Sequence, residues 1–115
     1  MRRRFQAAVD LPFVSPSELK AMLAGPRPPR LVDLRFDWER GLCRIEGDEW
    51  ADHEAVLRDG GGLKPEEDLV LYCKGQSKSA AAFRRLRELG FTKVKVLRGG
   101  IDAWAAEVDK GMTRY

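Results

Sequence analysis

The feature that most constrains the fold is a strand–helix–strand pattern in the second half of the chain. Asp68–Cys73 is an apolar run of strand length, and Val94–Leu97 is another. Between them, apolar side chains recur at three- and four-residue spacing from about Ser77 to a helix stop at Gly90, as on one face of an amphipathic helix. Because connections of this length suit right-handed crossovers between parallel strands, the segment predicts a βαβ unit.

The rest of the chain continues this alternation. Ser15 is suited to cap a helix, with Pro16 at the first helical position and Glu18 in the first turn, and these residues predict a helix to about Ala24. After it, the sequence predicts a buried strand at Leu31–Leu34 and a helical start at Asp37. It also predicts a short helix at Asp52–Arg58 and a last helix at Ile101–Val108.

These elements predict one α/β domain over residues 1–115, with a mostly parallel sheet of about four or five strands covered by helices on both faces. Sheets of this kind place their sites beyond the carboxyl ends of the strands. Cys73 stands at such an end.

Composition and charge exclude several classes of function. The chain has 21 basic and 18 acidic residues, a mixed balance that does not indicate a nucleic-acid partner. Its two cysteines and single histidine form no zinc or disulfide pattern, so we expect reduced thiols, no metal and no cofactor. Basic residues follow Met1, but polar residues interrupt Phe5–Phe13, and no apolar stretch has membrane-spanning length. We therefore expect a cytoplasmic protein without a membrane partner.

The loop after Cys73 carries the predicted chemistry. Backbone N–H groups at a strand–helix junction and the start of a helix favour an anion, and Lys74 and Lys78 add positive charge. These features favour the thiolate, which is the nucleophilic form of cysteine. We expect Cys73 to be catalytic and the loop to bind substrate through Lys74, Gly75, Gln76, Ser77, Lys78 and Ser79.

No general base adjoins Cys73 in the sequence, and the sole histidine, His53, lies in the least regular stretch of the chain. This argues against acyl transfer of the Cys–His kind. Sulfur transfer does not need a base, because a thiolate that attacks a sulfane sulfur forms a persulfide anion, which the same loop would stabilise.

Three motifs together resemble the rhodanese family. Asp33-Leu34-Arg35 resembles its Asp-x-Arg, Tyr72-Cys73 and the loop to Ser79 resemble its active-site loop, and Leu97-Arg98-Gly99-Gly100 with Trp104 resembles its closing motif. The chain also resembles a narrower group, the rhodanese domain at the C-terminus of adenylyltransferases that activate ubiquitin-like sulfur carriers. This similarity lies in Leu42-Cys43-Arg44-Ile45, residues 103–109 and Tyr115.

The resemblance implies a three-layer rhodanese-like fold and a sulfurtransferase that carries a persulfide on Cys73. It implies a persulfide or thiosulfate donor, and a thiol or a ubiquitin-like sulfur carrier as acceptor, with an adenylyltransferase as a further partner. Asp33 and Arg35 would brace the site from behind. Lys78 stands where the family often has arginine. A lysine lacks the bidentate guanidinium group with which the arginine of related phosphatases holds phosphate.

Other readings stay open beside this one. An idle rhodanese module that docks a partner through its basic loop and helix faces is the alternative function. Cys43 is interpreted as a structural thiol and His53 as a surface or loop residue, while Trp38, Trp50 and Trp104 are interpreted as core or staple residues.

Overall fold

A computed structural model describes residues 11–115, and the basic start of the chain at Met1–Arg4 lies outside them. Within the described residues, five parallel strands form one sheet in the order β1-β5-β4-β2-β3. Their bounds are Phe13–Val14 for β1, Arg30–Asp33 for β2, Glu49–Trp50 for β3, Leu69–Tyr72 for β4 and Val94–Leu97 for β5. The prediction of a parallel α/β sheet is confirmed.

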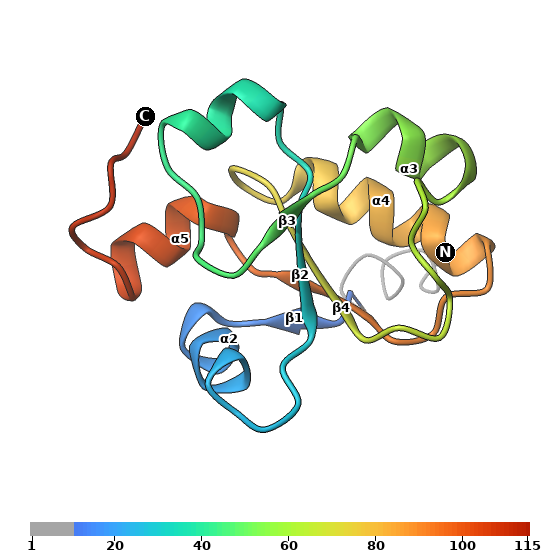
Figure 1. Ribbon diagram of the computed structural model, residues 1–115, viewed down its shortest axis with the longest axis horizontal. Helices are drawn as coiled ribbons and strands as arrows, with labels where there is room; N and C mark the ends of the chain where they lie inside the picture. Colours follow the sequence, from blue (N-terminus) through green and yellow to red (C-terminus); the bar gives the residue numbers. More distant parts are fainter. Residues whose placement is uncertain (1–10) are drawn as a thin grey trace, which may run out of the picture.

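Helices cover both faces of the sheet, as Figure 1 shows. Helices α2 (Pro16–Leu23) and α5 (Gly100–Glu107) pack together on one side, and α3 (His53–Asp59) and α4 (Ser77–Glu88) pack together on the other. A short 3-10 helix, η1 (Asp37–Gly41), stands beyond the carboxyl end of β2. This is the three-layer arrangement that the sequence predicts.

The helix that was predicted from its N-terminal signal begins where expected. Ser15 Oγ accepts a hydrogen bond from the backbone N–H of Glu18, and the Glu18 carboxylate accepts one from the backbone N–H of Ser15. This reciprocal capping box fixes the start of α2. A local signal also ends a helix: α3 stops where Gly60 adopts a left-handed conformation with φ 91°.

Alternate side chains of the central strand β4 enter two separate cores. Leu69 and Leu71 pack with residues of α4, while Val70 and Tyr72 pack with residues of α2 and α5. All four are fully buried. Burial of each such side chain stabilises the fold by about 2 kcal/mol, so both cores hold the carboxyl end of β4, and with it Cys73, in place.

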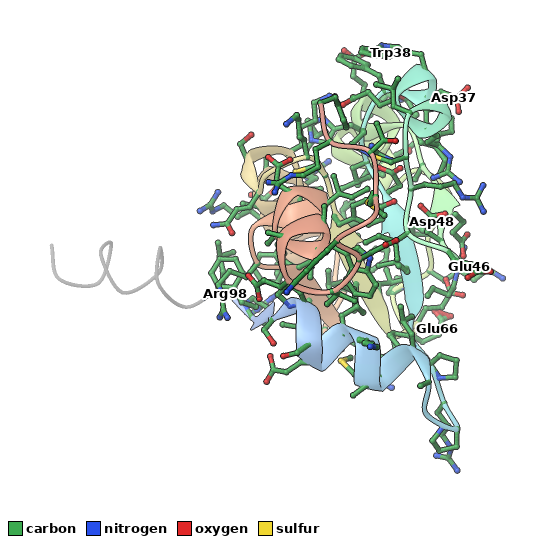
Figure 2. All side chains as sticks on the ribbon, turned by 90° about the vertical axis from the view of Figure 1, so that its left-hand side faces the viewer. Asp37, Trp38, Glu46, Asp48, Glu66 and Arg98 are labelled. Carbon is green, nitrogen blue, oxygen red and sulfur yellow. The ribbon has the colours of Figure 1, made fainter. Side chains whose placement is uncertain are left out.

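The prediction for the tryptophans is wrong in part. Trp104 is buried in the core of α2 and α5. Trp38, however, is 67% exposed and stands out at the tip of the molecule beside Asp37 (Figure 2). Trp50 is 41% exposed on the edge strand β3, where its indole N–H donates to the carbonyl of Arg35. Trp38 and Trp50 lie in segments without a regular apolar period. The sequence therefore does not indicate which side of these segments is buried.

Candidate functional site

Cys73 directly follows β4 and lines a hollow of about 240 Å³. Its side chain is buried, with 3% of the residue exposed. The hollow brings together residues from three segments, the end of β2, η1 and the Cys73 loop: Arg35, Phe36, Glu39, Cys73, Lys74, Gly75, Ser77 and Lys78. The structure therefore places most of the predicted substrate-binding residues around the sulfur.

Ser79 and Gln76, the two predicted loop residues outside this lining, support the loop from within. Ser79 is fully buried, and its Oγ lies 3.5 Å from Cys73 Sγ and donates to the carbonyl of Gln76. The Gln76 side-chain oxygen accepts a hydrogen bond from the N–H of Gly99 at 2.8 Å. Gln76 thus ties the loop to the turn before α5.

The backbone N–H groups of the loop after Cys73 have no acceptor among the described residues. Within residues 11–115, none of the backbone N–H groups from Lys74 to Ser79 donates to a protein acceptor. The last of these belong to the first turn of α4, where a helix has no internal acceptor to offer. Such groups are available to hydrogen-bond an anion that enters the hollow lined by Cys73 and this loop.

The start of α5 holds the loop through its backbone. The N–H of Ile101 donates to the carbonyl of Cys73 at 2.9 Å, and the N–H of Asp102 donates to the carbonyl of Lys74 at 3.1 Å. Gly100 makes this approach feasible, because a Cβ at this position would lie 2.1 Å from the Gly75 carbonyl oxygen. Its φ of 60° is also left-handed. In the sequence, the only sign of this role of Gly100 is the Gly99-Gly100 pair just before a predicted helix.

The two lysines of the loop do not stand free in the hollow. Lys74 Nζ lies 3.1 Å from the Asp102 carboxylate and 4.7 Å from the centre of the Tyr115 ring. Lys78 Nζ lies 3.6 Å from the centre of the Phe36 ring. Both ammonium groups are therefore held at the walls of the hollow, where their charge still acts on an anion inside it.

Asp33 and Arg35 form a buried ion pair behind the site. The Arg35 guanidinium lies 2.8 Å from the Asp33 carboxylate, and both side chains are almost fully buried. Arg35 also donates to the carbonyl of Cys43 and to the Tyr115 hydroxyl. Burial alone would lower the pKa of Arg35, but the hydrogen bonds to Asp33 and Tyr115 outweigh it and raise the pKa, so the guanidinium stays charged.

A second group of polar residues, which sequence reasoning missed, continues this network. Arg40 lies within 3.0 Å of the Asp33 carboxylate and 2.8 Å of the Asp48 carboxylate, and the Tyr72 hydroxyl donates to Asp48. Burial raises the pKa of Tyr72 far above its ordinary value, with the charges of Asp33 and Asp48 acting in the same direction. The Tyr72 hydroxyl therefore remains a donor at neutral pH.

The remaining polar candidates lie near the site without touching the sulfur. Cys43 is half-buried beneath Arg35, and the described residues form no bond between it and Cys73. His53 begins α3, and its Nε2 lies 3.1 Å from the carbonyl of Lys78. Within residues 11–115, no cluster of His, Cys, Asp and Glu is suited to a metal ion, and no helix is long and apolar enough to cross a membrane.

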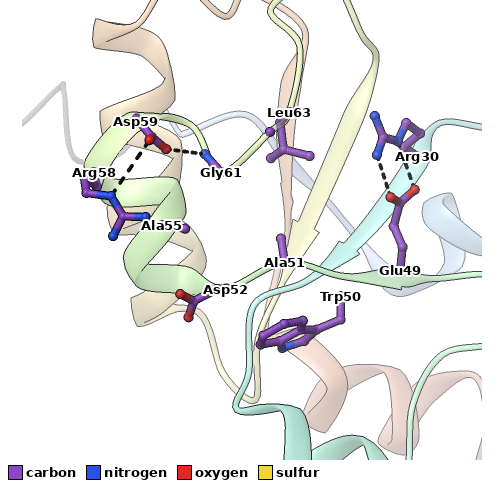
Figure 3. A pocket seen from close by; sticks show the side chains of 11 residues that line it. Arg30, Glu49, Trp50, Ala51, Asp52, Ala55, Arg58, Asp59, Gly61 and Leu63 are labelled. Carbon is purple, nitrogen blue, oxygen red and sulfur yellow. Dashed lines mark hydrogen bonds and ion pairs between the residues drawn. The ribbon is translucent and has the colours of Figure 1, made fainter.

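A larger hollow, of about 540 Å³, lies between β3 and the glycine turn after α3 (Figure 3). Four of its charged side chains form ion pairs, Arg30 with Glu49 and Arg58 with Asp59. Within the described part of the chain, its lining includes no cysteine, serine or threonine. Size therefore does not single out the reactive site, whereas the thiol and the free N–H groups do.

The sequence profile of the Rhodanese-like domain family matches residues 15–107. The chain belongs to this family. Among its relatives is MoeZ of Mycobacterium tuberculosis, named a probable adenylyltransferase/sulfurtransferase, which is 31% identical over 105 residues, or 89% of this chain. The alignment covers 26% of MoeZ, so the chain spans about a quarter of that relative's length.

Solved structures agree with this assignment. The rhodanese-like domain of the Anabaena protein Alr3790 is 29% identical and superposes with a TM-score of 0.73, covering 83% of this chain and 74% of that one. The human single-domain sulfurtransferase TSTD1 shares the fold with a TM-score of 0.73 at 24% identity, covering 84% and 96% of the two chains. The chain therefore has a rhodanese-like α/β fold and sulfurtransferases among its relatives.

Proposed function

We propose that this chain is a sulfurtransferase that carries sulfane sulfur as a persulfide on Cys73. The observation that carries the proposal is the position of Cys73 Sγ inside a loop whose backbone N–H groups, from Lys74 to Ser79, have no acceptor among the described residues. Such a loop stabilises a thiolate and, after reaction, the negative outer sulfur of a persulfide.

With a thiol as acceptor, the reaction consists of two displacements at sulfur. The Cys73 thiolate attacks the outer sulfur of a donor persulfide, R–S–S⁻, and forms Cys73–S–S⁻, while the donor S–S bond breaks and its electron pair leaves with R–S⁻. With thiosulfate as donor, the leaving group is sulfite. An acceptor thiolate then attacks the outer sulfur of the Cys73 persulfide and takes it, which releases the Cys73 thiolate. Electrons and atoms balance without an external oxidant.

The surroundings of the sulfur support this chemistry over acyl transfer. Among the described residues, Ser79 is the hydrogen-bonding partner of Cys73 Sγ, while His53 is bonded to the carbonyl of Lys78. Glu39 lines the hollow, but both of its carboxylate oxygens accept hydrogen bonds from other groups. Within residues 11–115, no side chain is thus positioned as a general base for a Cys–His mechanism.

The donor and acceptor follow from the relatives as part of the same proposal. Relatives named adenylyltransferase and sulfurtransferase support a protein persulfide as donor and a sulfur-carrier protein as acceptor. An adenylyltransferase would be the further partner, and the cytoplasm the compartment in which the thiols stay reduced.

Mass spectrometry after incubation with a persulfide donor tests the function. We expect one added sulfur atom on Cys73, removable by cyanide or a dithiol. Cys73→Ser abolishes the added mass, and Cys43→Ser, the matched control, leaves it nearly intact. A slow rate with thiosulfate is consistent with a protein donor.

Failure of every donor to load Cys73 would favour a catalytically idle docking module instead. The observation behind this second candidate is the exposure of apolar side chains on and beside η1, namely Phe36, Trp38 and Leu42. Phe36 also lines the hollow of Cys73, so a docked partner would cover the loop.

A further inference from the structure

The side chain of Tyr115 reaches the rim of the Cys73 hollow. Its hydroxyl donates to Glu39 Oε2 at 2.6 Å and accepts a hydrogen bond from Arg35 at 2.8 Å. Both of these partners line the hollow. Tyr115 is 37% exposed, so a role in the folding core does not account for these contacts.

The Tyr115 ring also contacts the residue that follows the catalytic cysteine. Lys74 Nζ lies 4.7 Å from the ring centre, and the Asp102 carboxylate lies 3.1 Å from the same nitrogen. The ammonium group is thus held between an aromatic face and a carboxylate. Cation–π attraction limits the freedom of a lysine side chain that would otherwise extend into water.

Glu39 is the one residue of the hollow's lining whose charge would oppose an anion. It is 8% exposed. The backbone N–H of Phe36 donates to its Oε1, and the Tyr115 hydroxyl donates to its Oε2. Burial and the bond to Glu39 raise the pKa of Tyr115 to about 12, against the opposing effect of Arg35, so the hydroxyl keeps its proton at neutral pH. Donation from this hydroxyl reduces the negative charge that Glu39 presents to the hollow.

We propose that Tyr115 is a positioning residue for sulfur transfer: its ring holds the Lys74 ammonium beside Cys73, and its hydroxyl neutralises part of the Glu39 charge. The inference deepens the proposed function and rests on it. Tyr115 acts through Lys74 and Glu39 on the charge at the sulfur, and so favours anionic donors and the persulfide anion.

Alkylation with two reagents of different charge tests this role without requiring sulfur transfer. The rates of Cys73 modification by iodoacetate, an anion, and by iodoacetamide, which is neutral, are measured by peptide mass spectrometry at one pH. Their ratio reports the electrostatic potential at the sulfur, because access and thiolate content affect both reagents. Tyr115→Leu removes ring and hydroxyl, whereas Tyr115→Phe removes the hydroxyl alone. Trp38→Leu is the matched control on an exposed aromatic outside the hollow.

We expect Tyr115→Leu to lower the ratio about three- to fivefold and Tyr115→Phe to lower it about twofold, with both effects shrinking in 1 M salt. In a Glu39→Gln background, Tyr115→Phe should have no further effect, because the charge that the hydroxyl offsets is gone. Trp38→Leu should leave the ratio unchanged. Thermal unfolding checks that each variant is folded. If Tyr115→Leu does not fold, Tyr115→Phe alone still tests the role of the hydroxyl.

An unchanged ratio in folded Tyr115 variants overturns the inference, as does an equal Tyr115→Phe effect with and without Glu39. Persulfide loading separates this result from the proposed function. If the wild type loads sulfur while the ratio does not respond to Tyr115, the function stands and the positioning role fails. If the wild type never loads sulfur but the ratio falls as expected, the proposed function fails and the effect of Tyr115 on the charge at Cys73 stands.

Discussion

Two segments enclose Cys73, and different kinds of bonds hold them. The loop Cys73–Ser79 is fixed through backbone hydrogen bonds, since the carbonyls of Cys73 and Lys74 accept from the start of α5. The segment from Arg35 to Asp48 is fixed through charged side chains, of which Arg35 and Arg40 pair with buried carboxylates.

The difference shows how each segment responds to change. Backbone bonds do not depend on side-chain identity, so the bonds of the loop to α5 tolerate side-chain changes at Cys73 and Lys74, provided that Gly100 keeps the close approach of α5 open. Buried charges, in contrast, are costly to desolvate and need every partner, so the loss of any one partner leaves an uncompensated charge.

The largest expected effect comes from Gly100→Ala. The added Cβ would meet the carbonyl oxygens of Gly75, Cys73 and Lys74 at 2.1–2.5 Å, and the positive φ adds backbone strain. We expect a loss of about 4 kcal/mol in the free energy of unfolding, measured by urea denaturation. Gly41→Ala is the control, because no atom lies within 4 Å of its added Cβ. Equal losses in the two variants would show that the approach of α5 is not what constrains Gly100.

Asp33→Asn tests the charged segment. The change leaves two buried or partly buried guanidinium groups, those of Arg35 and Arg40, without their shared carboxylate. We expect a loss of about 3 kcal/mol in the free energy of unfolding. Asp59→Asn, which breaks an ion pair that is mostly exposed, should cost less than about 0.5 kcal/mol. A near-neutral Asp33→Asn would mean that the network does not hold the segment.

The smallest expected effect is an alkaline loss of stability that depends on Tyr72. Its pKa is raised in the folded state by burial and by Asp33 and Asp48, while the unfolded chain titrates near 10.0. A group with a raised folded pKa contributes its stability below the unfolded pKa and loses it as pH rises above that value.

Between pH 8 and pH 10.5, the wild type should therefore lose about 0.8 kcal/mol more of its free energy of unfolding than Tyr72→Phe does. Urea denaturation at several pH values measures the difference. Parallel pH profiles of the two proteins would contradict the expectation and show that the Tyr72 hydroxyl does not sense the buried network.

Local sequence rules predicted the regular parts of this protein. The apolar runs before Cys73 and at Val94–Leu97, the amphipathic period of α4 and the cap at Ser15 each act over a few residues, so the chain itself specifies them. The position of Cys73 beyond a parallel strand and before a helix follows from the same rules.

Tertiary structure alone decided the rest. Tyr72 meets Asp48 across 24 positions of the chain and Arg40 meets Asp48 across eight, and β3 has two residues, too few for a period to be recognised. The contacts of Tyr115 with Glu39 and Lys74 depend likewise on how α5 and η1 are brought together. Their physical cause is the pairing of buried charges and polar groups across the fold, for which spacing along the sequence gives no signal.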